Sequence, residues 1–181
     1  MHRKFTLLTC LVVVMIIVSC KKSNSPQNPN GLVGNWNFLY IKANTTASIT
    51  VSGITNVTVA NYTSQNNAGT ATFTADSLAL KGLAYSVNTT ATAYQYMGST
   101  LIGSSTVPFT ASVPSTNETV AYKVIGSDSL NFPGGGPVPG AGSGGRFTIK
   151  GDTLNIAVNG STIGPGGVNE VVTGNIYFLK Q

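Results

Sequence analysis

Apolar and polar residues alternate with a period of two over much of the chain from Leu32 to its end. The clearest runs of this kind are 36–40, 83–87, 107–113 and 176–180. Thr, Val, Ile, Tyr and Phe are abundant in these runs, as β-strands require. No run places apolar residues three and four positions apart, as an amphipathic helix would. The pattern therefore predicts an all-β fold.

A short Asp-Ser/Thr-Leu pattern follows a strand-like run at three places, 76–78, 128–130 and 152–154. In the third copy Gly151–Asp152 suits a two-residue hairpin turn, because glycine accepts the positive φ of the first corner. That turn pairs Phe147 with Ile156 and Ile149 with Leu154, and it puts both apolar pairs on one face.

The same register applied to the other two copies predicts two further hairpins. It pairs Phe73 with Leu78 in the first copy and Ile125 with Leu130 in the second. The aspartates are best explained by turn chemistry, since aspartate bonds its own backbone in such turns. Pro108 and Pro114 flank another strand-like run and indicate a sheet edge or a bulge there.

The first twenty residues have the character of an export signal. His2, Arg3 and Lys4 precede an apolar run, Leu7 to Val18, whose helix would reach about 18 Å, too short for a hydrocarbon core of roughly 30 Å. Residues 17–20 (Ile-Val-Ser-Cys) resemble the lipobox of bacterial lipoproteins. The resemblance implies that residues 1–19 are removed and that Cys20 becomes lipidated, with membrane lipid as its partner.

Residues 20–31 are predicted to be a flexible tether, since the stretch 23–30 has two prolines and no apolar residue. The acid-rich tag that resembles a surface-export signal in lipoproteins of the Bacteroidetes type does not occur here. By that resemblance we expect a lipid-anchored protein of the outer membrane that faces the periplasm.

Removal of residues 1–19 from the 181-residue chain would leave 162 residues, enough for one domain, 32–181, with a core. The remaining chain has no histidine and no cysteine other than Cys20, which excludes disulfides and metal sites built on imidazole or thiolate. Its eight basic and five acidic residues give a net charge of only +3, so composition does not indicate nucleic-acid binding.

Catalytic chemistry finds little support in this composition. Serine or threonine would need a base other than imidazole. Three of the five acids lie in predicted turns, and nothing brings Glu118 and Glu170 together. We therefore predict that the protein is not an enzyme and needs no cofactor.

Gly34-Asn35-Trp36, near the start of the first predicted strand, resembles the G-x-W motif of lipocalins and of lipocalin-like domains in Bacteroidetes lipoproteins. The resemblance implies an antiparallel up-and-down β-barrel, in which Trp36 plugs the closed end and Lys180 packs over it through a cation–π contact. An antiparallel β-sandwich is the alternative fold.

A barrel of this kind would bind a small, mostly apolar ligand. The aromatic residues expected to line it are Phe73, Tyr94, Tyr96, Phe109, Tyr122 and Phe147. The alternative function is that of a non-catalytic structural or adhesive β-domain, acting as an accessory of an envelope complex with an unknown protein partner.

The lipobox resemblance makes a direct prediction. Mass spectrometry of the protein extracted from membranes should show an N-terminus at Cys20 carrying acyl chains, because two or three chains hold a domain stably on a bilayer. An unmodified Cys20, or cleavage at another position, would contradict it.

Overall fold

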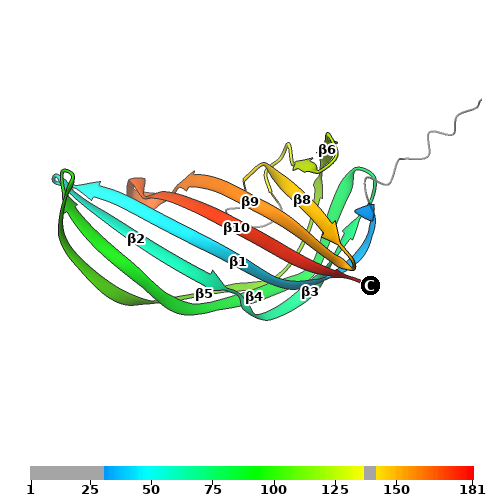
Figure 1. Cartoon of the computed structure of the whole chain (residues 1–181), viewed down its shortest axis with the longest axis horizontal. Helices are drawn as coiled ribbons and strands as arrows, with labels where there is room; N and C mark the ends of the chain where they lie inside the picture. The colour runs from blue at the N-terminus through cyan, green and yellow to red at the C-terminus, as the bar shows by residue number, and fades with distance from the viewer. Residues whose placement is uncertain (1–30, 137–141) are drawn as a thin grey trace, which may run out of the picture.

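A computed structural model describes residues 31–136 and 142–181 of the chain (Figure 1). The expected signal peptide, Cys20 and all but the last residue of the expected tether lie outside the described residues. Within them the fold is all-β and antiparallel, as predicted, and it contains no α-helix.

Ten strands and one short 3₁₀ segment make up the described chain. They are β1 (Gly34–Val51), β2 (Ile54–Thr63), β3 (Gln65–Phe73), β4 (Ser77–Met97), β5 (Thr100–Ala121), β6 (Lys123–Ile125), β7 (Ser129–Asn131), β8 (Gly144–Lys150), β9 (Thr153–Ile163), η2 (Pro165–Gly167) and β10 (Asn169–Lys180).

The strands follow one another around the sheet in chain order, with two interruptions. β2 and β3 act as one long strand broken at Ser64, since β1 and β4 each pair with both. β5 and β6 act as a second long strand, broken at Tyr122, of which β5 pairs with β4 and β6 pairs with β7. β10 returns to pair with β1 along most of its length. The order is the up-and-down order expected of a barrel.

Ser64 holds the first break together through buried hydrogen bonds. Its amide donates to the Ile41 carbonyl oxygen at 2.8 Å, and its hydroxyl oxygen accepts from the Ile41 amide at 2.8 Å. Asn67 then caps the kink, because its side-chain amide donates to the Ser64 carbonyl oxygen at 3.2 Å. Ser64 is one of the few buried polar residues, and these partners satisfy it.

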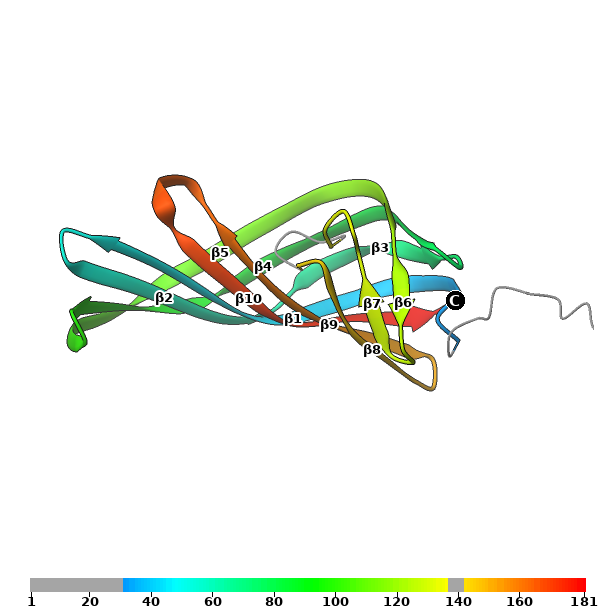
Figure 2. The same cartoon turned by 90° about the horizontal axis from the view of Figure 1, so that it is seen from above.

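Tyr122 closes the sheet into a ring at one end. Its amide donates to the Asp76 carbonyl oxygen at 2.8 Å, which continues the β4–β5 ladder, and the next residue, Lys123, already pairs with Asn131 of β7. The Tyr122 hydroxyl also donates to the Thr74 carbonyl oxygen at 2.5 Å. The end that holds the first described residue and the C-terminus is therefore closed (Figure 2).

The opposite end of the ring is open. β5 pairs with β4 on one side, and on its other side it has no strand partner among the described residues. β9 pairs with β8 only from Thr153 to Ile156, so within the described ranges its continuation to Ile163 has no strand partner on that side. The hairpins β1–β2 and β4–β5 extend beyond the closed part of the sheet (Figure 1).

A dense apolar core fills the closed end. Its largest fully buried side chains, all less than 2% exposed, are Trp36, Phe73, Leu32, Leu78, Leu83 and Leu154. The Tyr122 ring packs edge-on against Phe73 at a centroid distance of 5.7 Å and lies 6.2 Å from Phe132. The alternation read from the sequence produces this core, because each strand turns its apolar residues to the inside.

Two of the three predicted hairpin registers are confirmed. Phe147 pairs with Ile156 and Ile149 with Leu154 around the Gly151 turn, and Phe73 pairs with Leu78.

The register predicted for the second hairpin is wrong by one residue, because Val124 pairs with Leu130. The turn is three residues long and begins with Gly126 at φ +64°. A slip of one residue turns every side chain to the other face. Ile125 is consequently 57% exposed.

A bulge in β1 interrupts the alternation predicted for Trp36, Phe38 and Tyr40. The register with β10 shifts between Phe38 and Tyr40. Tyr40 therefore lies on the outer face, against Tyr177 at 4.6 Å, while Ile41 takes the buried position.

The prolines mark the edge as predicted, since Pro108 and Pro114 both lie in β5, which pairs with β4 on one side and has no strand partner on the other among the described residues. A bulge also occurs opposite Pro114, where the β4 register shifts between Leu83 and Tyr85. Both expected features, an edge and a bulge, are present.

Close backbone approach at Gly145 gives a stability prediction. A Cβ at this position would overlap the carbonyl oxygen of Ala157, whereas a Cβ at Gly134 would meet nothing within 4 Å. Gly145→Ala should lower the free energy of unfolding by about 1–3 kcal/mol, because β8 must move away from β9. Gly134→Ala should change it by less than about 0.5 kcal/mol. Urea unfolding of both variants measures this, and equal stabilities would contradict the packing described.

Candidate functional site

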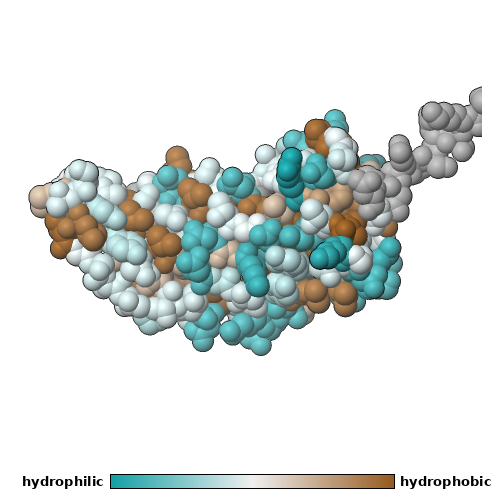
Figure 3. Space-filling model, in the orientation of Figure 1, coloured by the Kyte–Doolittle hydropathy of each residue, from teal (hydrophilic) through white to brown (hydrophobic). Residues whose placement is uncertain are grey.

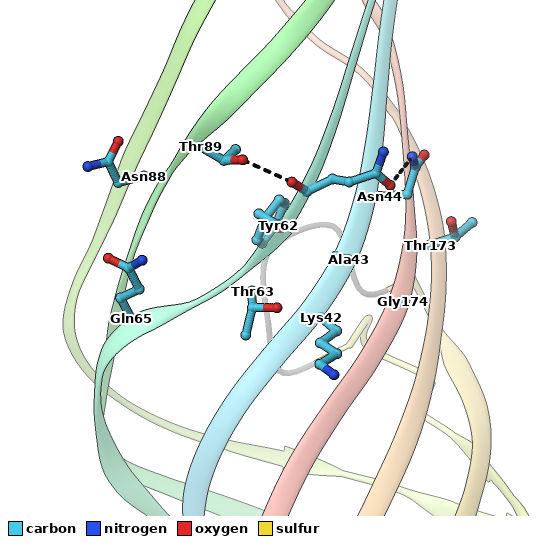
Figure 4. Close-up of a pocket in the computed structure, with 11 residues that line it drawn as sticks. Lys42, Ala43, Asn44, Tyr62, Thr63, Gln65, Asn88, Thr89, Thr173 and Gly174 are labelled. Carbon is cyan, nitrogen blue, oxygen red and sulfur yellow. Dashed lines mark hydrogen bonds between the residues drawn. The ribbon is translucent and has the colours of Figure 1, made fainter.

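A polar groove on the outer face marks a gap in the sheet. The β2–β4 ladder stops where Ala60 pairs with Ala91, and the β3–β4 ladder begins where Gln65 pairs with Ser86. A depression of about 560 Å³ lies over this gap (Figure 4). Its lining residues are Lys42, Ala43, Asn44, Asn61, Tyr62, Thr63, Gln65, Asn88, Thr89, Thr173 and Gly174.

Several polar groups of this outer groove form hydrogen bonds with one another. Asn44 donates through its side-chain amide to the Asn61 side-chain oxygen at 2.8 Å, and the Thr89 hydroxyl donates to the Asn61 carbonyl oxygen at 3.1 Å. Lys42 is the one charged residue in the lining and is exposed. A ligand here would replace water on exposed amides and hydroxyls, which yields little net free energy.

A second pocket, of about 280 Å³, lies on the inner face of the sheet. Its lining residues come from six strands: Thr45, Tyr62, Tyr85, Val87, Phe109, Ala111, Val113, Thr162, Glu170 and Val172. We call this the inner pocket. Because both β5 and β9 contribute to it, the pocket spans the gap between the two unpaired edges. Most of its lining is aromatic or aliphatic, as in small-molecule sites.

The strand registers explain why these side chains meet. Thr45 pairs with Val172 across β1 and β10, and Tyr85 pairs with Val113 across β4 and β5. Directly paired residues share a face of the sheet. The ladder therefore turns the side chains of Thr45 and Val172, and of Tyr85 and Val113, to the same inner face.

Tyr85 lies between the inner pocket and the apolar core and contacts both. Its ring lies 6.1 Å from Phe38, and Phe38 lies 5.9 Å from Phe178 deeper in the core. The Tyr62 ring lies 6.2 Å from Phe109 across the pocket. The inner pocket is thus the place where the aromatic core of the closed end stops and the open end begins.

Burial shapes the electrostatics of the two tyrosines. Burial, helped by the neighbouring Tyr62, raises the pKa of Tyr85 to about 12. Burial also raises the pKa of Tyr62; a hydrogen bond from Thr45 lowers it partly, and the negative charge of Glu170 raises it further. Both phenols therefore stay neutral at physiological pH, in a poorly hydrated site.

The structure does not bring together the six aromatic residues expected to line one cavity. Only Phe109 reaches the inner pocket. Phe73, Tyr122 and Phe147 are at most 2% exposed and belong to the packed core. Tyr94 and Tyr96 share a face, as expected, with ring centroids 6.5 Å apart.

That shared face is the outer one. Tyr94 pairs with Val57, and Val57 pairs with Ser48 on the face opposite to Thr45. Tyr94 and Tyr96 therefore lie away from the inner pocket.

The residues of the G-x-W motif lie at the closed end. Trp36 is fully buried, and its indole nitrogen donates to the Leu32 carbonyl oxygen at 2.9 Å. Lys180 pairs with Trp36 across β1 and β10, and its Nζ lies 5.9 Å from the ring centroid, within cation–π range. Gly34 opens β1 at φ +147°, a value that L side chains rarely adopt.

Ionisable groups form no reactive cluster in the described part of the chain. Residues 31–136 and 142–181 hold no group of three acidic, histidine or cysteine side chains that could bind a metal ion. Within the same ranges the one ion pair joins Arg146 to Asp128 at 3.7 Å, and both side chains are largely exposed. No helix in this part of the chain is long and apolar enough to cross a bilayer.

Tyr62 lines the inner pocket but is not among the residues expected there from the sequence, although a signal for it exists. A two-residue turn at Ser52–Gly53 fixes the β1–β2 register and places Tyr62 opposite Ala43. Glu170 carries no comparable signal, because its place depends on the long-range pairing of β10 with β1.

Comparison of the chain with protein-family models, curated proteins and solved structures finds no match.

The raised pKa of Tyr85 predicts a weakness at alkaline pH. An unfolded tyrosine ionises near its ordinary pKa of about 10, whereas folded Tyr85 keeps its proton to about pH 12. Its contribution to stability is complete below pH 10 and should be lost as pH rises towards 12. Unfolding free energies between pH 9 and 12 should fall less steeply in Tyr85→Phe than in the original protein. Identical slopes would contradict the proposed burial effect.

Proposed function

We propose that this protein is a lipid-anchored component of the cell envelope that binds a small, mostly apolar molecule in the inner pocket. The observation that carries the proposal is a pocket on the inner face of the sheet, lined by residues of six strands that include Tyr62, Tyr85 and Phe109. Its volume of about 280 Å³ lies near the lower limit for ligand pockets, roughly 300 Å³, and favours a compact ligand.

The larger outer groove is the weaker candidate. Among its polar residues, Asn44, Asn61 and Thr89 already form hydrogen bonds with one another. Removal of apolar surface from water contributes about 25 cal/mol per Å². Most of the inner pocket's lining is aromatic or aliphatic, whereas in the outer groove Tyr62 and Ala43 lie among mainly polar side chains. Binding free energy is therefore expected to come from the inner face.

The arrangement of the chain suits an anchored binding protein. Gly31 lies at the closed end, so an N-terminus lipidated at Cys20 would hold that end towards the membrane (Figure 1). The open end then points away from the bilayer. A ligand arriving from the aqueous compartment would meet the open gap between β5 and β9 without obstruction from the membrane.

A second candidate function rests on the tip of the open end. Val51, Met97, Leu101 and Ile102 are each about half exposed there, and apolar side chains gather at this tip in Figure 3. Exposed apolar patches often mark contact sites for other proteins. This observation favours the accessory or adhesive role named above. That role would leave the inner pocket without a ligand.

A pair of tryptophan variants on one strand tests the proposal. Ala111 lines the inner pocket, whereas its neighbour Thr110 pairs with Asn88 on the outer face. The full chain in lipid nanodiscs should bind the neutral probe 1-naphthalenemethanol in equilibrium dialysis. Ala111→Trp should fill the pocket and weaken binding by about tenfold or more, a loss of roughly 1.4 kcal/mol. Thr110→Trp should leave it unchanged.

Empty nanodiscs provide the reference for probe dissolved in lipid. Binding that is equal in both variants and in the original protein would place the probe elsewhere and contradict the proposal. A protein that takes up no more probe than empty nanodiscs would contradict it as well, and would favour the role of the exposed tip.

A further inference from the structure

One charged residue lines the inner pocket, and it is Glu170 of β10. It pairs with Ala47 of β1 on the inner face, next to the pair formed by Thr45 and Val172. The six strands that line the pocket carry four other charged residues: Lys42, Lys81, Glu118 and Lys180. None of the four lines the inner pocket, and Lys42 faces the outer groove.

Glu170 has no ion-pair partner in the described ranges of the chain, where the one ion pair is between Arg146 and Asp128. As a whole, Glu170 is only partly exposed. A partly buried carboxylate loses hydration free energy, and a positively charged partner would compensate for that loss. None of the described residues that line the inner pocket supplies such a partner.

The aromatic residues of the lining favour a positively charged ligand, as the Glu170 carboxylate does. Tyr62, Tyr85 and Phe109 line the pocket, and the ring centroids of Tyr62 and Phe109 lie 6.2 Å apart. The faces of aromatic rings attract cations, more strongly where water is excluded. The charge of Glu170 acts on this interior, since it contributes to the raised pKa of Tyr62.

We infer that the inner pocket selects a cationic amphiphile, in which an ammonium group meets Glu170 and an apolar body contacts the aromatic walls. The inference rests on the proposed function, because it specifies the ligand class of the same pocket. An anionic amphiphile such as a fatty acid would be repelled by Glu170 and would find no basic residue in the lining. The pocket is therefore an amine site.

Three probes with one ring system separate charge from shape. They are 1-naphthylmethylamine, 1-naphthalenemethanol and 1-naphthoate, which are cationic, neutral and anionic at pH 7. Equilibrium dialysis of the full chain in nanodiscs, with empty nanodiscs as reference, should show the amine binding about tenfold more tightly than the alcohol. Naphthoate should bind most weakly.

Two carboxylate variants complete the test. Glu170→Gln should reduce the affinity for the amine to that for the alcohol and leave the alcohol unchanged, which also shows that the pocket still folds. Glu118→Gln removes an equal charge from the closed part of β5 and should leave all three affinities unchanged. Circular dichroism and thermal unfolding check the fold of each variant.

The outcomes distinguish the inference from the function on which it rests. Alcohol and amine binding with equal affinity to the original protein would overturn the amine selectivity while leaving apolar ligand binding intact. A preference for the amine that persists in Glu170→Gln would also overturn it. Binding of none of the three probes would overturn both the inference and the proposed function.

Discussion

The change of pairing partner at Tyr122 decides the shape of the whole molecule. Up to this residue the long strand β5 pairs with β4, and beyond it β6 pairs with β7. The buried ring between Phe73 and Phe132 fixes the crossing, and its hydroxyl is satisfied by the Thr74 carbonyl oxygen. A buried phenol without that partner would cost free energy, so the ring, the hydroxyl and the ladder stabilise one another.

Closure at one end alone creates two environments in a single sheet. At the closed end the switch from β5 to β6 joins β4 to β7, and an apolar core fills the interior. At the open end β5 and β9 separate, and the long hairpins carry threonine, serine and asparagine between small apolar residues. The inner pocket forms at the boundary, where the core stops before the strands do. Glu170 lies at this boundary, and it is the one charged residue among those that line the inner pocket.

The sequence was sufficient for the all-β character of the chain and for two of the three local hairpins. Period-two alternation identified an all-β chain, and the turn at Gly151 fixed its register because a two-residue turn leaves one choice. The register at Gly126 was missed because the turn has three residues, and a single extra residue exchanges Ile125 for Val124 on the inner face.

The site was harder to predict than the fold. Aromatic residues on one face of a strand look alike in sequence, whether they fill a core, line a pocket or face solvent. Phe73 lies in the closed part of the sheet, whereas Phe109 lies in the open part. This difference in position depends on pairings between strands far apart in the chain. The bulge in β1 that sends Tyr40 outward gives no local signal either. Whether an aromatic residue fills the core, lines the pocket or faces solvent therefore depends on long-range strand pairing, which alternation alone does not reveal.

The central claim is that the open half of the sheet holds a ligand on its inner face. Methyl NMR of the full chain in nanodiscs tests it most directly, with 1-naphthylmethylamine added to saturation. We expect nuclear Overhauser effects from the naphthalene ring to the methyl groups of Val87, Val113 and Val172, which line the inner pocket. Effects confined to the methyl group of Thr173 in the outer groove, or to Leu101 at the tip, would contradict the account.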